Sequence, residues 1–110
     1  MPEQTTHILH VTERALWDAA RAGGTYEMST LGRTLQEEGF VHCSTRAQLP
    51  GTAAAFYADL DDLVVLVIDP ALLDVPVKYE APQPGAEAFP HVYGPIPVTA
   101  VVAVETWPAS

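Results

Sequence analysis

The segment DLVVLVIDP, residues 62–70, decides the fold. Its central residues, Leu63–Ile68, form an unbroken apolar run that is rich in valine. An apolar run of this length between turn-forming residues is typical of a strand that is covered on both faces. We therefore expect Leu63–Ile68 to be the central strand of a sheet.

A first strand is predicted upstream, over residues 7–12. Extended backbone would place Leu9 and Val11 on one face of this strand and His10 and Thr12 on the other. One face is therefore apolar, and the other carries an imidazole and a hydroxyl.

A helix is expected to follow this strand, over residues 13–20. Thr12 can cap its start, and Gly23 and Gly24 can end it. Trp17 is the residue that we expect to pack the helix against the rest of the protein.

The other elements are short, and prolines and glycines mark many of their ends. We expect helices over 31–38 and about 52–58, strands over 40–44, 77–80, 91–93 and 99–106, and a loop over 81–90. Short strands interspersed with two or three helices, without regular βαβ alternation, favour a mixed α+β sheet. The chain has 110 residues, which leaves room for one domain over residues 1–110.

The composition limits the classes of partner. Fourteen acidic and five basic residues give a formal net charge of −9, which repels polyphosphate, so we expect no non-specific binding of nucleic acid. No apolar stretch reaches the roughly 20 residues of a membrane helix, and the start MPEQTTHILH has no signal-peptide pattern. We expect a cytoplasmic protein without a membrane span, whose partner is a small-molecule or nucleotide ligand.

Three short motifs each place a histidine and a hydroxyl on one strand face. The three pairs are His10 with Thr12, His42 with Ser44, and His91 with Tyr93. Both groups donate and accept hydrogen bonds, and imidazole titrates near neutral pH. This pattern predicts a polar cleft in which His42, His91 and Glu80 are catalytic and His10, Thr12, Ser44 and Tyr93 bind the ligand.

Metal and thiol chemistry are not expected. His7 and His10 would point to opposite faces of a strand, and the sequence has no HxH or HExxH motif. The single cysteine, Cys43, falls on the opposite strand face from His42 and is expected in the core. We predict no metal site.

Structural roles are alternatives for several of these residues. Thr12 and Ser44 each precede a predicted helix and could be N-caps, and His10 could be a hydrogen-bonded sheet histidine. His91 could lie on the surface while Tyr93 covers the loop. Likewise, the Glu80 carboxylate could form a surface ion pair with Lys78 or Arg46.

The segments GFVHCS, DLVVLVIDP and FPHVYGPIP resemble a bacterial family named domain-of-unknown-function family 952. ILHVT at the start and KYE before the loop appear in the order and at about the spacing of that family. The resemblance runs nearly from end to end, and the family has no settled activity.

A more distant resemblance implies a mechanism. ILHVT, VHCS and VVLVID follow the order of HGT, VHLS and the later strand in RNA 2′-phosphotransferases and the wider ADP-ribosyltransferase superfamily. The resemblance implies split mixed β-sheets with NAD in the cleft, His10 on the adenosine-side ribose, and Ser44 near nicotinamide. Val11 replaces the glycine of HGT, and His91 lies about where the transferase glutamate would be, with Glu80 and Glu87 as substitutes.

These observations give three hypotheses for function. The first is an NAD- or nucleotide-binding enzyme with an ADP-ribosyltransferase-like fold, transferring ADP-ribosyl or phosphoryl groups. The second is a lyase, isomerase or cyclase that uses His42 and His91 with Glu80 on a neutral organic substrate. The third is a ligand-binding module without catalysis.

Overall fold

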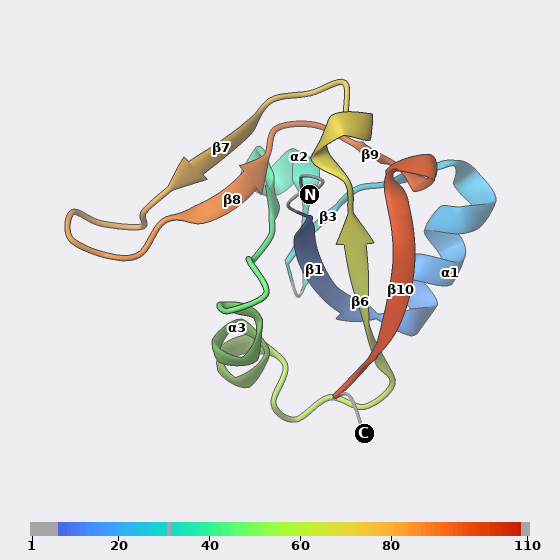
Figure 1. Ribbon diagram of the computed structural model, residues 1–110. Helices are drawn as coiled ribbons and strands as arrows, with labels where there is room; N and C mark the ends of the chain where they lie inside the picture. The colour runs from blue at the N-terminus through green and yellow to red at the C-terminus, as the bar shows by residue number, and fades with distance from the viewer. Residues whose placement is uncertain (1–6, 31, 109–110) are drawn as a thin grey trace, which may run out of the picture.

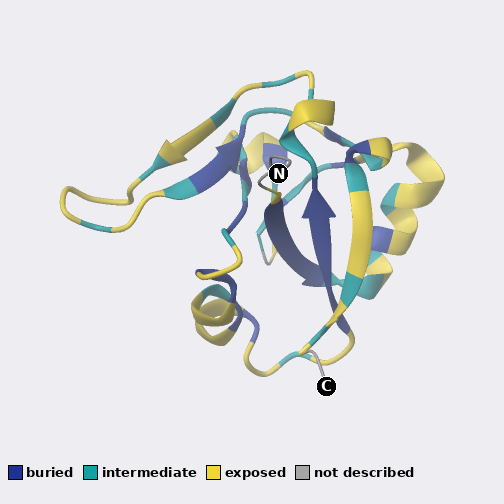
Figure 2. Ribbon diagram, viewed as in Figure 1, coloured by how far each residue is buried: buried dark blue, intermediate teal, exposed yellow. Residues whose placement is uncertain are grey.

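In a computed structural model, which describes residues 7–30 and 32–108, Leu63–Ile68 forms strand β6 with every residue buried. Strand β6 lies between β1 (Ile8–Glu13) and β10 (Val101–Trp107), and both neighbours are antiparallel to it (Figure 1). The prediction of a central strand is therefore confirmed. Figure 2 shows that β1 and β6 are buried along their length, whereas β10 is largely exposed.

A second three-stranded antiparallel sheet carries the residues of the cleft. Its order is β5 (Val41–His42), β8 (Phe89–Val92) and β7 (Val77–Glu80). The β7 and β8 strands form a hairpin that projects from the body of the protein (Figure 1). Two backbone hydrogen bonds connect the two sheets, since the amides of Leu9 and Ser44 each donate to the carbonyl of the other, at 2.8 and 2.7 Å.

Smaller elements complete the fold. They are the helices α1 (Arg14–Gly23), α2 (Leu35–Glu38) and α3 (Leu49–Phe56), the paired strands β2 (Thr25–Tyr26) and β9 (Ile96–Pro97), the paired strands β3 (Met28–Thr30) and β4 (Arg33–Thr34), and the 3-10 turns η1 (Pro70–Leu72) and η2 (Val98–Ala100). The described part of the chain is thus a small mixed α+β fold with three helices and several small antiparallel sheets. Within it, no helix has the length and apolar character needed to cross a membrane.

The core lies on both faces of the central sheet. On one face, Ile8 and Leu66 pack with Trp17 of α1, as the sequence predicts for that tryptophan. On the other face, Leu9 and Val11 pack with residues of α3 and its C-terminal turn. Alternation along β1 therefore follows the predicted parity.

The start of α1 differs from the prediction. Glu13, not Thr12, is the N-cap, and its side chain makes no capping hydrogen bond. The Thr12 side chain is buried and hydrogen-bonded to the Tyr26 hydroxyl instead. The end of α1 is as predicted, because Gly24 adopts the left-handed conformation with φ 96° and donates its amide to the Ala20 carbonyl.

The predicted helix over 31–38 is restricted to α2, and position 31 lies outside the described residues. Strand β4 occupies the first part of the predicted helix and pairs with β3 just before it. Thr34 is the cap, and its hydroxyl and the Glu37 carboxylate form a reciprocal capping box.

The boundaries of several further elements also differ: β5 is shorter than the predicted strand 40–44, and β8 begins at Phe89, inside the predicted loop 81–90. Helix α3 begins at Leu49, not near Thr52, because Pro50 falls in the first turn, where its missing N–H is tolerated. It ends at Phe56, slightly before the predicted end. The last strand begins at Val101, since η2 occupies the positions immediately before it.

Candidate functional site

A cavity of about 370 Å³ lies where the two three-stranded sheets meet. Its lining comes from β1, β3, β4, α2, β5, α3, β8 and the loop before β8. Leu9 and Val11 supply apolar lining, and His42 and His91 bring polar atoms to it. A mostly apolar cavity with a few polar groups is the usual form of a small-molecule site.

The β5 and β8 strands bring the two predicted catalytic histidines together. His42 and His91 are paired residues in the sheet, and their ring centroids lie 5.1 Å apart at an interplanar angle of 76°. Phe40 supports both rings: it stacks on His91 at 4.1 Å and meets His42 edge-on at 4.7 Å. Phe40 and His42 lie on the same face, as two residues separated by one position in extended backbone do.

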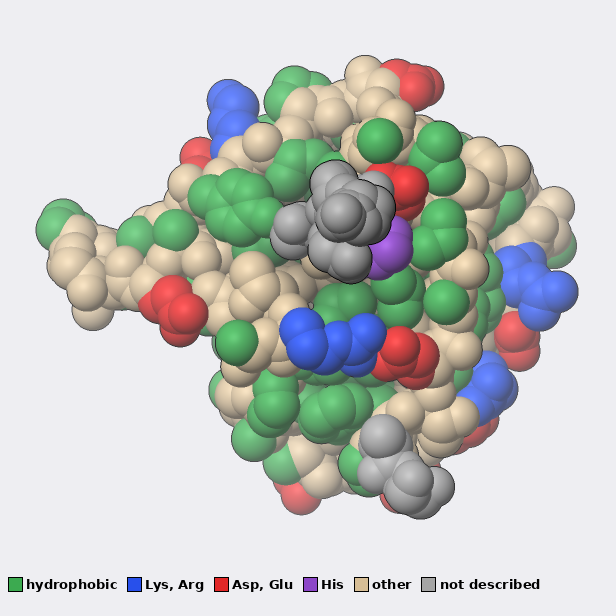
Figure 3. All heavy atoms as spheres, viewed as in Figure 1, with side chains coloured by type: hydrophobic (Ala, Val, Ile, Leu, Met, Phe, Trp, Pro, Cys, Tyr) green, Lys and Arg blue, Asp and Glu red, His purple; other side chains and the backbone are tan. Residues whose placement is uncertain are grey.

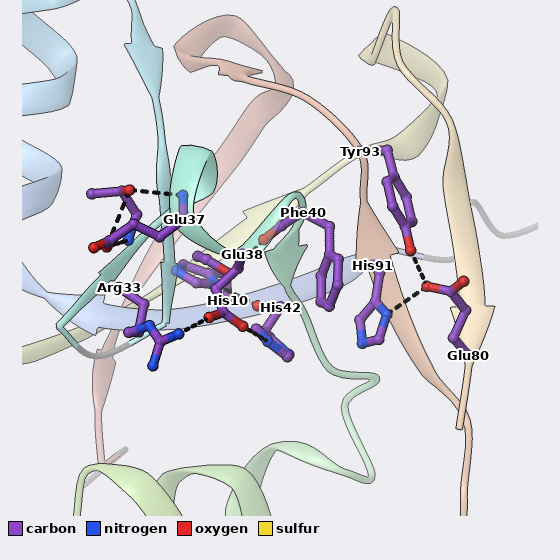
Figure 4. Close-up of polar contacts among 11 residues, drawn as sticks. His10, Arg33, Glu37, Glu38, Phe40, His42, Glu80, His91 and Tyr93 are labelled. Carbon is purple, nitrogen blue, oxygen red and sulfur yellow. Dashed lines mark hydrogen bonds and ion pairs between the residues drawn. The ribbon is translucent and has the colours of Figure 1, made fainter. Parts of the chain in front are cut away.

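Glu80 lies behind His91, on the neighbouring strand. His91 Nδ1 is 2.8 Å from Glu80 Oε1, and the Tyr93 hydroxyl donates a hydrogen bond to the same oxygen (Figure 4). The hydrogen bonds from Tyr93 and then His91 lower the pKa of Glu80, whereas Glu80 raises the pKa of Tyr93. A surface pair of Glu80 with Arg46 is excluded, because Arg46 binds Glu105 through two contacts of 2.7 and 3.0 Å.

His42 has its own carboxylate. Glu38 Oε1 lies 3.7 Å from His42 Nε2, and its other oxygen is 2.6 Å from Arg33 Nη2. Burial lowers the pKa of His42, the nearby His91 lowers it further, and Glu38 opposes both effects. The His42 side chain keeps 40% of its surface exposed, so it remains accessible from the cavity.

His10 lines the cavity, but both of its ring nitrogens bind protein atoms. Nδ1 donates to the His42 carbonyl at 2.6 Å, and Nε2 is 2.8 Å from the Tyr26 hydroxyl. Complete burial lowers the pKa of His10 to about 4, so the ring is neutral at pH 7. These contacts fit the alternative role of His10 as a hydrogen-bonded sheet histidine, and Thr12 belongs to the same buried group.

Ser44 and Cys43 also border the cavity. The Ser44 hydroxyl is 3.0 Å from Thr52 Oγ1, and it does not cap α3, whose N-cap is Gln48. The Cys43 side chain packs in the core, as predicted, and burial raises the pKa of its thiol. A deprotonated thiolate is thereby disfavoured.

Glu38, Phe40 and Arg33 are members of the site that the sequence patterns did not identify. Glu38 stands four residues before His42, a spacing that could have suggested a contact around the turn at Gly39. Phe40 lies two residues before His42, a spacing that places both side chains on one face of an extended segment. Nothing in the local sequence indicated that Arg33 would reach the cavity.

Charge at the site is largely compensated. Figure 3 shows that, on the face viewed, Lys and Arg side chains lie beside Asp and Glu side chains.

Within residues 7–30 and 32–108, no three His, Cys, Asp or Glu side chains are grouped as metal ligands. The site combines two imidazoles and two carboxylates, which can accept, donate and relay protons.

Known proteins place the chain in a family. The crystal structure of Protein CC0527 from Caulobacter crescentus is 35% identical, with a TM-score of 0.79, over 92% of this chain and 85% of that chain. The solution NMR structure of CC0527 is also 35% identical, with a TM-score of 0.72, over 89% of this chain and 81% of that chain. No curated protein matches the chain. The family model described as "Protein of unknown function (DUF952)" matches residues 11–104, and the chain therefore belongs to this family.

Proposed function

We propose that the cavity is the active site of an enzyme that transfers protons on a small organic substrate, as a lyase, isomerase or cyclase does. One observation carries the proposal: His42 and His91 face each other at 5.1 Å, and each has a carboxylate beside it. Two acid–base groups at this separation can act on neighbouring atoms of one bound molecule.

His91 is the proposed general base. Its Nδ1–H donates to the Glu80 carboxylate, so in the neutral ring Nε2 is the atom that can accept a proton. Figure 4 shows this second nitrogen directed away from Glu80 and toward His42. Glu80 is a positioning residue that fixes the tautomer and orientation of His91, and Tyr93 fixes Glu80.

His42 is the proposed partner of His91. Its lowered pKa keeps the ring neutral near pH 7, and a neutral imidazole can donate one hydrogen bond and accept another. Glu38 orients this ring, and Arg33 holds Glu38 in turn. His42 can therefore donate a hydrogen bond to a substrate oxygen on which charge develops, while His91 holds the abstracted proton and returns it to the substrate or to water.

A generic proton-transfer substrate tests this proposal without knowledge of the natural one. Nitrobenzisoxazole opens its ring when a base removes one C–H proton, and the phenolate product is coloured. We expect the wild-type protein to accelerate this reaction relative to free imidazole at equal concentration. The His91→Gln variant should lose roughly 100-fold of the rate, because a positioned base contributes about 10²–10⁴-fold.

The exposed His7 supplies the matched control, since it is a histidine outside the cavity. The His7→Gln variant should keep the wild-type rate. Equal rates for wild type, His91→Gln and His42→Gln, or no acceleration at all, would contradict the proposed function. Binding of a ligand without any proton transfer would instead support a ligand-binding module.

A second candidate is an NAD- or nucleotide-binding transferase with an ADP-ribosyltransferase-like fold. It is favoured by two small sheets that join at one bridge, with a cavity beside the junction that His10 and Ser44 help to line. Against it, the His10 nitrogens are already bonded and Arg33 is paired with Glu38. Calorimetry with NAD, ADP-ribose and a 2′-phosphorylated oligonucleotide tests it, and binding that His42→Ala abolishes would support it.

A further inference from the structure

The cavity has distinct polar and apolar parts. Its polar groups include His42 and His91 with the Arg33 and Glu38 ion pair. On the side of α3 and of the start of β8, the lining is aromatic, with Phe56 and Phe89. A ligand that fits this cavity therefore needs one polar end and one apolar body.

Phe56 and Phe89 stand between two hollows. Both line the main cavity, and both also line a second hollow of about 280 Å³. Phe56 is 59% exposed, which is the largest exposure of any large hydrophobic side chain in the described part of the chain. A phenyl ring left in water at the edge of a cavity offers a flat apolar surface that a ligand can cover.

The charges beside the cavity disfavour an ionic ligand. Arg33 is neutralised by Glu38 at 2.6 Å, so it offers little free positive charge to an anion. A negatively charged ligand would also approach the Glu38 carboxylate, which lines the cavity. That carboxylate already has Arg33 as a cationic partner, so a cation gains little from it.

We propose that the substrate is a neutral molecule with a planar ring, which lies against Phe56 and Phe89 while its polar group meets His42 and His91. The inference rests on the proposed function for the identity of the reacting end. It adds the chemical class of the substrate and assigns Phe56 as a determinant of specificity. A cavity of about 370 Å³ lies near the lower end of the usual range for small-molecule sites, which suits a compact ring system.

A set of ligands of nearly equal shape tests the class. Benzamide is neutral, benzoate is an anion, benzamidine is a cation, and cyclohexanecarboxamide is neutral but not planar. We expect benzamide to bind most tightly in calorimetry and to shift the NMR signals of Phe56, Phe89 and His91. Benzoate and benzamidine should bind at least about 10-fold more weakly, and the non-planar amide should lose several-fold through its weaker stacking.

Two substitutions locate the binding surface. Phe56→Ala should weaken benzamide binding roughly 10-fold, because one ring–ring contact and its buried area are lost. Tyr79→Ala is the matched control, since Tyr79 is also an exposed aromatic, at 54%, and does not line the cavity. Equal binding by the charged ligands, unchanged binding by Phe56→Ala, or no binding of benzamide would overturn the inference.

The outcomes separate this inference from the proposed function. If benzamide binds as expected but His91→Gln retains the proton-transfer rate, the ligand class stands and the proposed role of His91 fails. If His91 is required for proton transfer but benzamide does not bind or the charged analogues bind better, the ligand class fails alone. Binding of intact NAD that Phe56→Ala leaves unchanged would also contradict the inferred class.

Discussion

His42 and His91 are direct partners across the β5 and β8 strands, with ring centroids 5.1 Å apart. At this distance, a proton on one ring disfavours a proton on the other. The two rings also differ in their carboxylate contacts, which are 2.8 Å for His91 with Glu80 and 3.7 Å for His42 with Glu38. The two histidines therefore differ in how strongly a neighbouring carboxylate acts on them, although the residue type is the same.

The first prediction concerns the titration of His42. Its pKa should lie below 6.5, because burial and His91 both disfavour its charged form. Replacing His91 with Gln should raise the pKa of His42, whereas Glu38→Gln should lower it further, because the carboxylate favours the charged form. NMR titration of the imidazole signals measures both changes. Shifts in the same direction for the two variants would contradict the electrostatic arrangement.

The second prediction concerns the loss of stability in acid that the buried His10 causes. Its pKa of about 4 in the folded state lies below the ordinary histidine pKa of 6.5, so the unfolded chain takes up this proton first as the pH falls. The free energy of unfolding should therefore decrease from pH 6.5 to about 4, by about 3 kcal/mol from this group alone. Above pH 6.5, both states are neutral at this residue and the contribution disappears.

Urea unfolding at a series of pH values measures this dependence. The His10→Gln variant should show a shallower slope between pH 6.5 and 4, whatever its stability at neutral pH. His7→Gln should keep the wild-type slope, because its side chain is exposed. A His10→Gln slope equal to that of wild type would show that the buried imidazole is not the cause.

The third prediction concerns the Tyr26 hydroxyl, which is 2.8 Å from both His10 Nε2 and Thr12 Oγ1. Tyr26→Phe should lower the free energy of unfolding by roughly 1–3 kcal/mol, because two buried polar groups lose a partner. Tyr79→Phe removes a hydroxyl from an exposed residue and should change stability little. Equal stabilities for the two variants in chemical denaturation would contradict this role of Tyr26.

The fourth prediction concerns Gly94, which follows Tyr93 of the site. A Cβ atom at this position would lie 2.5 Å from Val75 Cγ1, so Gly94→Ala should destabilise the fold by roughly 1–3 kcal/mol. Adding Val75→Ala should recover part of the loss. Gly51→Ala is the control: nothing lies within 4 Å of its added Cβ, and alanine should stabilise α3 by roughly 0.5–1 kcal/mol.

Strand patterns predicted the mixed α+β class and the strand face on which His42 lies, because parity is a local property. The run at Leu63–Ile68 identified the central strand, and the alternation around His42 separated the cavity face from the core face. Helix starts were less predictable. Thr12 and Thr34 are both plausible caps by residue type, and Thr34 caps α2. The Thr12 hydroxyl instead accepts a hydrogen bond from Tyr26, a residue that is distant from the start of α1, and caps no helix.

Contacts between distant segments were the main part of the site that local patterns could not predict. The expected ligand role of His10 depended on free ring nitrogens, and only the folded chain shows that the His42 carbonyl and Tyr26 occupy them. The ion pair of Arg33 with Glu38 joins α2 to β4, which lies where the helix was predicted. All of these residues are visible in the sequence, but no local pattern indicates that they contact one another.

The junction between the two sheets is made by the main-chain amides and carbonyls of Leu9 and Ser44. Any amino acid except proline carries these atoms, so these two bonds do not depend on which side chains surround them. Beside them, the His10 side chain of β1 donates to the His42 carbonyl of β5 and connects the same two sheets. Related chains could therefore exchange the other walls of the adjoining cavity, and with them the molecule that is accepted, while these bonds keep the two sheets in the same mutual position.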